Sequence, residues 1–428
     1  MSDLIADLRW RGLIHQTTDE KLGEWLAAGQ RTLYAGFDPT ADSLHIGHML
    51  PLLGLRRFQK AGHRPIALVG GATGMIGDPS GKSEERNLLS PEVLAANVAG
   101  MERQMREILD FEPGPRAAVL VNNLDWMRGF GYLDFLRDVG KNFPVNVMLA
   151  KDSVKARLER TDSGLSYTEF SYMLLQAYDF VHLNRTFGCE LQIGGSDQWG
   201  NITAGIDLAR RMHSVQVYGM TGPLLTKSDG SKMGKTESGA IWLSPQRTSP
   251  YAFYQFWINI DDADAGKCLR FFTDLSHAEI EALDQSRAEN AGARESQRRL
   301  AAEMTQLVHG EAGLSSALRA TEIFFGAEIN SLSDAQLQEI FTDVPSRDLP
   351  RERLNEPGLN IADALVEAGL AKSKGDARRT ITQGGAYVNN RRVPAVETQL
   401  TSQDLASETV LVLRSGKRNY ALLRFAAE

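Results

Sequence analysis

Two histidines separated by two residues, His45-Ile46-Gly47-His48, are the first residues of this sequence whose types and spacing suggest chemistry. They lie where a strand-like segment, 31–37, gives way to a segment with apolar residues at helical spacing, 48–61. The positive end of a helix disfavours protonated histidine, so both side chains should be neutral hydrogen-bond donors unless an anion lies beside them. A triphosphate is such an anion, and Gly47, which has no Cβ, would let a flat base lie against the backbone. A histidine-containing helix cap would give the same four residues.

The loop that carries these histidines, 38–47, connects a strand to a helix, which is where open α/β sheets bind ligands. Pro51 follows closely. A proline fits a helix best in the first turn, because a first-turn N–H has no intrahelical partner to lose. We therefore expect Pro51 to lie in the first turn of this helix.

A second candidate is the glycine-rich loop from Gly70 to Lys82, which follows a predicted strand. Its spacing is not that of a phosphate-binding P-loop, and no Gly-x-Gly-x-x-Gly is present. The glycines would let the backbone approach a ligand, with Asp78 offering a carboxylate and Lys82 and Arg86 offering cations. A tight surface turn is the alternative.

A third candidate is a helix opened by a capping box, Ser166-Tyr167-Thr168-Glu169. Tyr172, Gln176 and Asp179 fall on one face of it, and apolar neighbours supply the packing. Such a row lines a small polar pocket or forms a solvated face.

Two further stretches complete the candidates. Asp197 and Gln198 follow a predicted strand, where a carboxylate can accept hydrogen bonds from ribose hydroxyls. The loop 224–236 contains Lys-Met-Gly-Lys-Thr at 232–236, and its lysines would either fold over an anion or be solvated.

The elements that must position these residues alternate short apolar strands with amphipathic helices from Arg31 to Met220, which predicts a Rossmann-like parallel sheet with helices on both faces. The expected strands are 31–37, 65–69, 117–121, 190–193 and 215–219, with helical stretches at 144–160 and 167–183.

At 428 residues the chain should form two or three domains. We expect a catalytic domain at 1–247, an all-helical domain at 248–325, a proline-containing linker at 326–355, and a small α+β module at 356–428. The module combines two short helices with strand-rich segments.

The net charge of −7 is unevenly distributed. Residues 351–428 hold 12 Lys and Arg against 9 Asp and Glu, a net +3 that leaves −10 for the rest. An acidic body with a basic tail suits a protein that meets RNA through part of its surface. The basic residues expected to contact the phosphate backbone are Lys372, Lys374, Arg378, Arg379, Arg391 and Arg392.

The His-Ile-Gly-His segment and the Lys-Met-Gly-Lys-Thr segment together resemble the HIGH and KMSKS signatures of class I aminoacyl-tRNA synthetases. Gly234 and Thr236 replace the two serines of the second signature, as in bacterial tyrosyl-tRNA synthetases. Tyr34, Asp78 and the row on 167–183 also match that family, and the tail resembles its small RNA-binding domain of the S-four type.

The resemblance implies a role for each matched residue. Tyr34 and Asp179 would hydrogen-bond the phenol of L-tyrosine, and Asp78, Tyr172, Gln176 and Gln198 would hold the rest of the amino acid, its ammonium group above all. ATP would be bound by Asp38, Thr40, His45, Gly47, His48, Asp197 and Lys235. The pyrophosphate charge would be stabilised in the transition state by His45, His48, Lys82, Arg86, Lys232, Lys235 and Thr236.

This chemistry needs no general base, because the carboxylate of tyrosine is already ionised when it attacks the α-phosphate. ATP is then a co-substrate that brings Mg²⁺, and we expect no tightly held metal or organic cofactor. The tyrosyl group would pass to the 3′-terminal ribose of tRNA(Tyr), without a separate editing site. The resemblance also implies a homodimer.

No signal peptide or apolar run of membrane-spanning length is evident, so we expect a cytoplasmic protein. Two cysteines cannot form a disulfide framework or a four-ligand zinc site. The alternatives are tryptophanyl-tRNA synthetase, which shares both signatures, and a non-catalytic RNA-binding protein on a synthetase fold.

Overall fold

The chain divides into two compact units, residues 1–248 with 256–308 and residues 249–255 with 309–428. The computed structural model describes residues 3–79, 89–151, 154–155, 158, 165–236, 239–329, 332–342 and 344–426. Two helices contribute to both units, α12 (Pro250–Ile258) and α15 (Glu295–Phe324). Gly310 interrupts α15 with non-helical angles, φ 70° and ψ −177°, close to the division.

The first unit is built on a six-stranded sheet in the order β1-β6-β5-β2-β3-β4. Strands β2 to β6 are parallel, and β1 pairs antiparallel with β6 at one edge. The strands are β1 (Gln16–Thr17), β2 (Thr32–Phe37), β3 (Arg64–Val69), β4 (Val119–Asn122), β5 (Cys189–Gly195) and β6 (Tyr218–Gly222). The predicted sheet with helices on both faces is confirmed, with the antiparallel edge strand as an addition.

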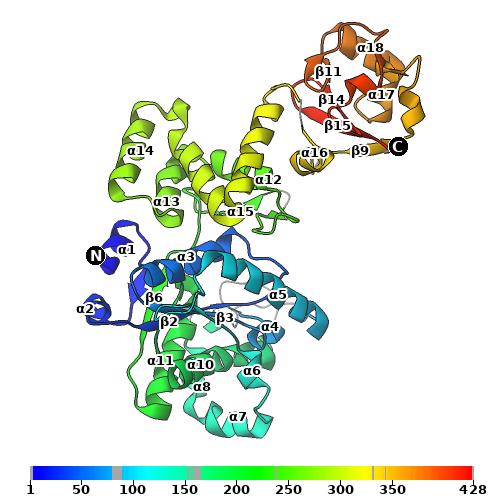
Figure 1. Cartoon of the computed structure of the whole chain (residues 1–428). Helices are drawn as coiled ribbons and strands as arrows, with labels where there is room; N and C mark the ends of the chain where they lie inside the picture. The colour runs from blue at the N-terminus through cyan, green and yellow to red at the C-terminus, as the bar shows by residue number, and fades with distance from the viewer. Residues whose placement is uncertain are drawn as a thin grey trace. The chain divides into compact units, whose positions relative to one another are not determined.

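Helices α3 and α5 cover one face of this sheet, and α10 and α11 cover the other (Figure 1). Because both faces are covered, β3 is buried along nearly its whole length. The helices of the first unit include α1 (Leu4–Trp10), α2 (Leu22–Ala27), α3 (Ile46–Lys60), α4 (Thr73–Ile76), α5 (Pro91–Ile108), α6 (Leu124–Met127), α7 (Tyr132–Asp138), α8 (Val145–Leu149), α10 (Tyr167–Phe187), α11 (Trp199–His213), α13 (Asp262–Phe272) and α14 (His277–Glu289).

Helix α3 forms because its apolar residues repeat at helical spacing and face the sheet. Met49, Leu52, Leu53 and Phe58 are all buried. Its C-terminal half is tied to the end of α13, since the Arg57 guanidinium donates to the carbonyl oxygens of Phe271 (2.8 Å) and Thr273 (3.1 Å).

Three local predictions were wrong. Pro51 lies inside α3, beyond its first turn, where it cannot donate to the carbonyl oxygen of Gly47. The strand expected at 215–219 begins only at Tyr218. The continuous helix expected at 144–160 ends at Leu149, and much of the remainder of that range lies outside the described residues.

The second unit contains a five-stranded sheet in the order β12-β11-β14-β15-β9. Its strands are β9 (Ser346–Leu349), β11 (Ala386–Val388), β12 (Arg391–Arg392), β14 (Val410–Ser415) and β15 (Asn419–Phe425), and β10 (Leu359–Asn360) pairs separately with β13 (Gln399–Leu400). Its further helices include α16 (Asp334–Ile340), α17 (Ile361–Glu367) and α18 (Lys374–Thr382).

Strands β14 and β15 each contribute to two cores, because successive side chains point to opposite faces. Leu411, Leu413 and Leu423 pack with α17 and α18, whereas Val412 and Leu422 pack with α16 and the end of α15.

The segment expected to be a linker, 326–355, is not a plain linker. It holds α16, and β9 pairs in parallel with β15. Proline content suggested a linker, but the apolar residues of α16 are buried against the C-terminal sheet. The other domain boundaries stay predictions.

Candidate active site

Most of the predicted site residues of the first unit line one cavity of about 660 Å³ at the carboxyl ends of the parallel strands. They come from β2 and the loop after it, the start of α3, α10 and the turn after β5, with Asp78 after α4 and Lys232 in the loop 224–236. The predicted residues that line the cavity are Tyr34, Asp38, Thr40, His45, Gly47, His48, Asp78, Tyr172, Gln176, Asp179, Asp197, Gln198 and Lys232.

Tyr34 and Asp179 form the most buried polar pair of this cavity, each only 1% exposed. The Tyr34 hydroxyl has no hydrogen-bond partner among the residues that the structure describes. Burial, reinforced by Asp179, raises the pKa of Tyr34 well above its usual value, so the hydroxyl keeps its proton. An unsatisfied buried hydroxyl costs about 1–3 kcal/mol, which a polar ligand can recover.

Asp179 is held by two donors that the sequence did not reveal. Asn123 Nδ2 donates to one carboxyl oxygen at 3.0 Å, and Trp126 Nε1 donates to the other at 2.9 Å. Burial raises the pKa of Asp179 to about 8, although both hydrogen bonds oppose the rise. The fold therefore orients this carboxyl toward the cavity and leaves it poorly solvated.

Tyr172 and Asp38 bind each other across the cavity. The Tyr172 hydroxyl donates to Asp38 at 3.0 Å, and the Thr73 hydroxyl donates to the other Asp38 oxygen at 2.7 Å. Burial, followed by the charge of Asp38, raises the pKa of Tyr172 well above its usual value. The described geometry thus links one residue predicted for the amino acid with one predicted for ATP.

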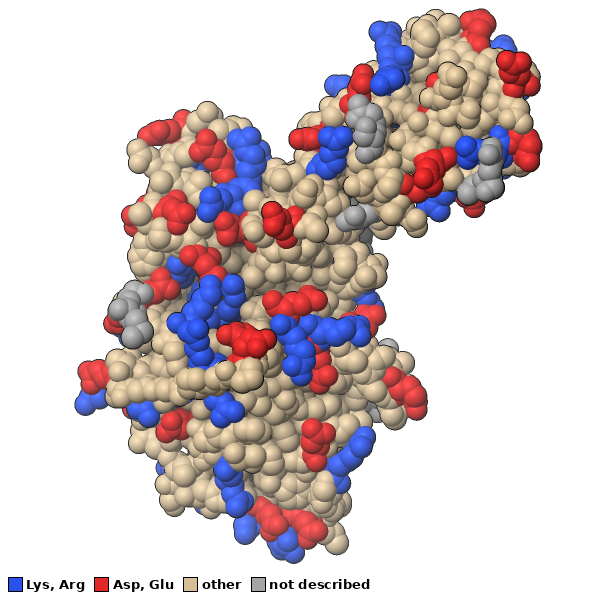
Figure 2. Space-filling view, in the orientation of Figure 1, with Lys and Arg blue, Asp and Glu red and all other residues tan. Residues whose placement is uncertain are grey.

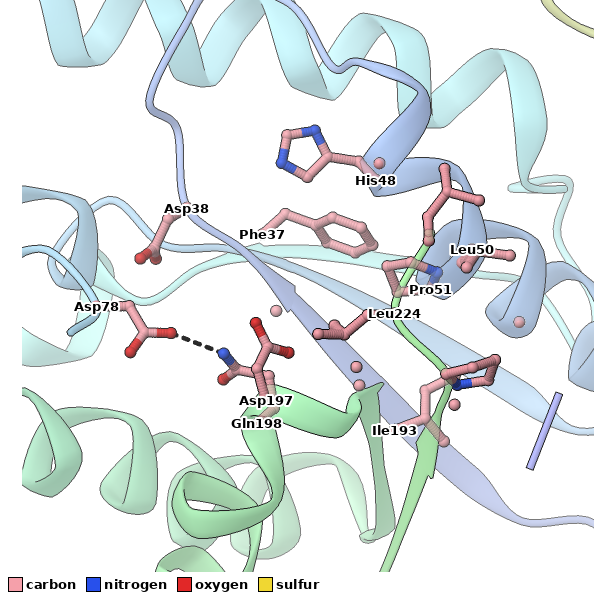
Figure 3. Close-up of a pocket in the computed structure, with 18 of the residues that line it drawn as sticks. Phe37, Asp38, His48, Leu50, Pro51, Asp78, Ile193, Asp197, Gln198 and Leu224 are labelled. Atoms are coloured by element: carbon pink, nitrogen blue, oxygen red, sulfur yellow. Dashed lines mark hydrogen bonds between the residues drawn. The ribbon is translucent and has the colours of Figure 1, made fainter. Parts of the chain in front are cut away.

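A second polar network joins Asp78 to the residues after β5. Gln198 Nε2 donates to Asp78 at 2.7 Å, and Gln176 Nε2 donates to Gln198 Oε1 at 3.2 Å. Figure 3 shows Asp78 and Gln198 facing each other, with Asp197 beside Gln198. Burial, followed by the charge of Asp78, raises the pKa of Asp197.

His45 and His48 cap the start of α3 with their side chains. The Gly47 N–H donates to His45 Nδ1 at 3.0 Å, and the His45 N–H donates to His48 Nδ1 at 3.2 Å. Because each Nδ1 accepts, each ring carries its proton on Nε2, which is therefore its donor atom. The space that a Gly47 side chain would fill is occupied by the His45 ring, 2.8 Å from an ideal Cβ.

The loop with the second signature contacts the same helix start. Gly234 has φ 92°, and a Cβ there would lie 2.6 Å from Ile46 Cγ1. Met233 is buried and its sulfur lies 3.7 Å from that of Cys268. Lys235 and Thr236 form β7 (Lys235–Thr236), which pairs with β8 (Gly239–Ala240). The side chains of these two residues, and the whole of Lys82 and Arg86, lie outside the described residues.

Further residues, which the sequence pattern did not identify, hold the loop 38–47 from α5. Asn97 Nδ2 donates to the Pro39 carbonyl oxygen at 3.0 Å, and Gln104 Oε1 accepts from the Leu44 N–H at 2.7 Å. Both lie on one face of α5 together with apolar residues. Polar side chains within an otherwise apolar helix face are the signal that could have found them.

The basic residues predicted to meet RNA are all exposed, but half of them are ion-paired. Lys374 lies 2.8 Å from Asp363, Arg379 lies 2.6 Å from Asp376, and Arg391 lies 3.1 Å from Glu328. The part of the chain that the structure describes offers no ion pair to Lys372, Arg378 or Arg392. Figure 2 shows acidic and basic side chains interspersed over the visible face of the protein.

Neither a membrane span nor a metal cluster is present in the described part of the chain. No helix there is long and apolar enough to cross a membrane. No group of three or more His, Cys, Asp or Glu side chains in the same ranges is arranged to hold a metal ion.

Comparisons with known proteins agree with the geometry. Residues 27–326 match the family described as tRNA synthetases class I (W and Y), and residues 336–423 match the tyrosine–tRNA ligase SYY-like C-terminal domain. Over 99% of its length the chain is 62% identical to the tyrosine–tRNA ligase of Rhodopirellula baltica, of which it covers 96%. It is 55% identical to that of Roseiflexus castenholzii, again over 99% of its length and covering 100% of the relative.

Among solved structures, a C-terminally truncated mitochondrial tyrosyl-tRNA synthetase of Aspergillus nidulans matches 75% of this chain and 94% of its own, with a TM-score of 0.68 and 31% identity. Full-length relatives, both domain families and the fold agree. The chain therefore belongs to the tyrosine–tRNA ligase family of class I aminoacyl-tRNA synthetases.

Proposed function

We propose that the cavity activates L-tyrosine with ATP and that the tyrosyl group then passes to the 3′-terminal ribose of tRNA(Tyr). The observation that carries this assignment is the buried Tyr34 hydroxyl, without a partner among the described residues, beside the Asp179 carboxyl. A phenolic O–H can accept from Tyr34 and donate to Asp179, whereas an indole or an unsubstituted phenyl ring cannot do both.

The remaining polar groups of the cavity would bind the amino-acid end of tyrosine. Asp78 supplies a carboxylate for its ammonium group, and Tyr172, Gln176 and Gln198 complete the hydrogen bonding. Gln198 and Gln176 already form a connected chain with Asp78. Such a chain fixes the carboxylate before the substrate arrives, which lowers the cost of ordering it on binding.

The start of α3 would bind the phosphates of ATP. His45 and His48 present Nε2–H donors at the positive end of the helix, where an anion is stabilised. Asp38, Thr40 and Gly47 line the same region, and Asp197 would accept hydrogen bonds from the ribose. Mg²⁺ would enter bound to the nucleotide.

The transition state needs positive charge near the departing pyrophosphate rather than a general base. Lys232 lines the cavity and is exposed enough to meet it. Lys82, Arg86, Lys235 and Thr236 stay predictions for the same role. Because Tyr34 and Asp179 would discriminate tyrosine from phenylalanine, a separate editing site would be unnecessary.

The C-terminal module would hold tRNA as a domain of the S-four type. Its exposed cations are Lys372, Lys374, Arg378, Arg379, Arg391 and Arg392, whose attraction to phosphate oxygens is independent of sequence. Acidic residues neutralise Lys374, Arg379 and Arg391 in the free protein. We therefore assign the larger contribution to tRNA binding to Lys372, Arg378 and Arg392.

A homodimer is supported by an apolar surface on α7, α8 and the start of α10. Its exposed members are Tyr132, Leu133, Val145, Val147, Leu149 and Tyr167. Tyr132 and Tyr167 are close enough to hydrogen-bond. Large exposed apolar patches are typical of interfaces between proteins.

Sedimentation velocity tests the homodimer. The wild type should sediment as a dimer, and Leu133→Asp should shift it toward monomer. A monomeric wild type contradicts this assignment.

A cytoplasmic location is supported by two free, buried cysteines, Cys189 and Cys268. Burial raises the pKa of the Cys189 thiol above the range of reactive cysteines and that of Cys268 to about 12.

Aminoacylation tests the assignment as a whole. With ATP, Mg²⁺ and unfractionated bacterial tRNA, the full chain should attach labelled tyrosine and not tryptophan, and release AMP and pyrophosphate. Charging with tryptophan would identify the alternative synthetase, and charging with neither would favour a non-catalytic RNA-binding protein.

A further inference from the structure

The segment that follows the signature loop runs antiparallel to the segment that contains His45. The Ile46 N–H donates to the Ile241 carbonyl oxygen at 3.1 Å, and the Leu243 N–H donates to that of Leu44 at 2.8 Å. Trp242 thereby lies directly opposite His45. The backbone pairing therefore fixes the backbone position from which the Trp242 side chain extends.

The His45 imidazole is enclosed by named groups on several sides. Its Nδ1 accepts from the Gly47 N–H, and its ring stacks on His48 with centroids 4.0 Å apart. The Trp242 ring meets it in an edge-to-face arrangement, with centroids 5.8 Å apart and an interplanar angle of 68°. Rotation of the imidazole away from His48 would therefore run into the indole.

Trp242 is in turn held by charged residues outside the cavity. The Arg247 guanidinium lies over the indole, 4.5 Å from the ring centroid. Arg247 Nε forms an ion pair with Asp42 at 2.6 Å. The backbone of Asp42 packs so closely on Gly100 of α5 that a Cβ at Gly100 would lie 1.9 Å from the Asp42 carbonyl oxygen. Helix α5 thus fixes the position of Asp42, and Asp42 in turn holds Arg247.

Trp242 does not belong to the described residues that line the cavity, so any effect on the reaction must pass through His45. We propose that Trp242, held by Arg247 and Asp42, is a positioning residue that keeps the His45 imidazole in the orientation needed at the phosphates of ATP. This inference rests on the proposed role of His45 in tyrosine activation. Trp242 should therefore affect the rate of adenylate formation and not the affinity for tyrosine.

Rapid-quench measurement of adenylate formation by the full chain tests the proposal. Trp242→Leu should slow adenylate formation about threefold to tenfold, the range that removal of an aromatic pair supplies. The dissociation constant of tyrosine should change less than twofold. Trp242→Phe, which keeps an aromatic ring against His45, should restore most of the rate.

A double-mutant cycle separates positioning from general weakening of the fold. In a His45→Ala background, Trp242→Leu should cause no further loss of rate, because the side chain it positions is gone. Arg247→Met should slow the wild type about twofold to fivefold, as expected for removal of a cation–π interaction, and should also have no effect in the His45→Ala background. Arg247→Met supplies the test if Trp242→Leu does not fold.

Losses that add in the double variants, or a weakened affinity for tyrosine at an unchanged rate, would overturn the positioning role. A wild type that forms no tyrosyl-adenylate would instead overturn the proposed function. The two failures are therefore distinguishable in one set of measurements.

Discussion

At the scale of single residues, the burial of the Asp179 carboxyl lowers the stability of the fold above about pH 4. Burial raises its pKa from 3.8 to about 8, so the folded protein binds a proton there that the unfolded chain has lost above about pH 4. The stability of the fold should therefore fall as the pH rises from about 4 to about 8, by at most about 1.4 kcal/mol per pH unit from this group.

Asp179→Asn should remove that dependence. The difference in melting temperature between the variant and the wild type should move in favour of the variant as the pH rises from 5 to 8, and then level off. Differential scanning calorimetry at several pH values measures it. A difference that does not change with pH would show that Asp179 is ionised throughout in the folded protein.

Tyr34→Phe should reduce the discrimination between tyrosine and phenylalanine. The variant loses one hydrogen bond to the phenol, so kcat/KM for tyrosine should fall about tenfold, while that for phenylalanine should stay or rise. Pyrophosphate exchange with both amino acids measures the ratio. Tyr178→Phe is the matched control, because Tyr178 is on the same helix as Asp179 but is not among the described residues that line the cavity. Equal losses for both amino acids would contradict the role of Tyr34.

Sequence pattern located residues that line the cavity but not those that hold them in place. Tyr172, Gln176 and Asp179 could be found because a helix repeats its face every three or four residues. Asn123 and Trp126 contact Asp179 from more than fifty positions away, through the fold of the sheet. A single sequence carries no periodic signal for such a contact.

At the scale of elements, the signature loop contacts α3 because Gly234 has no side chain. The position requires φ 92° and leaves no room for a Cβ beside Ile46. This is the physical reason for glycine where the common signature has serine.

Gly234→Ala should therefore lower the rate of adenylate formation about tenfold to a hundredfold by displacing the loop, without weakening tyrosine binding. Gly230→Ala is the matched control: it has a similar positive φ, 83°, but its Cβ would meet nothing within 4 Å. Stopped-flow kinetics compares the two variants. If both slow the reaction equally, backbone strain and not contact with Ile46 explains the effect.

Helices and strands were predicted well where buried residues recur at a regular spacing. They were predicted poorly where tertiary contacts override the local preference of the sequence. The parallel strands other than β6 lie close to their predicted positions. Pro51 was expected in the first turn of α3, but the helix begins at Ile46 because the His45 side chain caps it. The cap, not the proline, sets the start of this helix.

At the scale of the whole molecule, the residues proposed for activation and those proposed for tRNA binding belong to different units. The former lie within residues 1–248 and the latter within 309–428. The sequence predicted this separation from the charge difference, but not that 326–355 contributes β9 to the C-terminal sheet. Strand pairing over such a distance leaves no local trace in the sequence.

Combined replacement of Arg378 and Arg392 by alanine should weaken charging of tRNA and leave pyrophosphate exchange unchanged. The dependence of tRNA affinity on salt should flatten, by about 0.7–0.9 in the log–log slope for each phosphate group that the variant no longer binds. Arg319→Ala, on α15 and outside this sheet, is the control. Equal losses in both half-reactions would mean that these arginines stabilise the protein and do not bind RNA.

ATP–pyrophosphate exchange by the full chain, measured with each of the twenty amino acids in turn, tests the central claim most directly. Tyrosine alone should drive exchange well above background, because only a phenol can both pair with the unsatisfied Tyr34 hydroxyl and donate to the poorly solvated Asp179 carboxyl. Exchange driven as well by phenylalanine or tryptophan as by tyrosine, or no exchange with any amino acid, would contradict it.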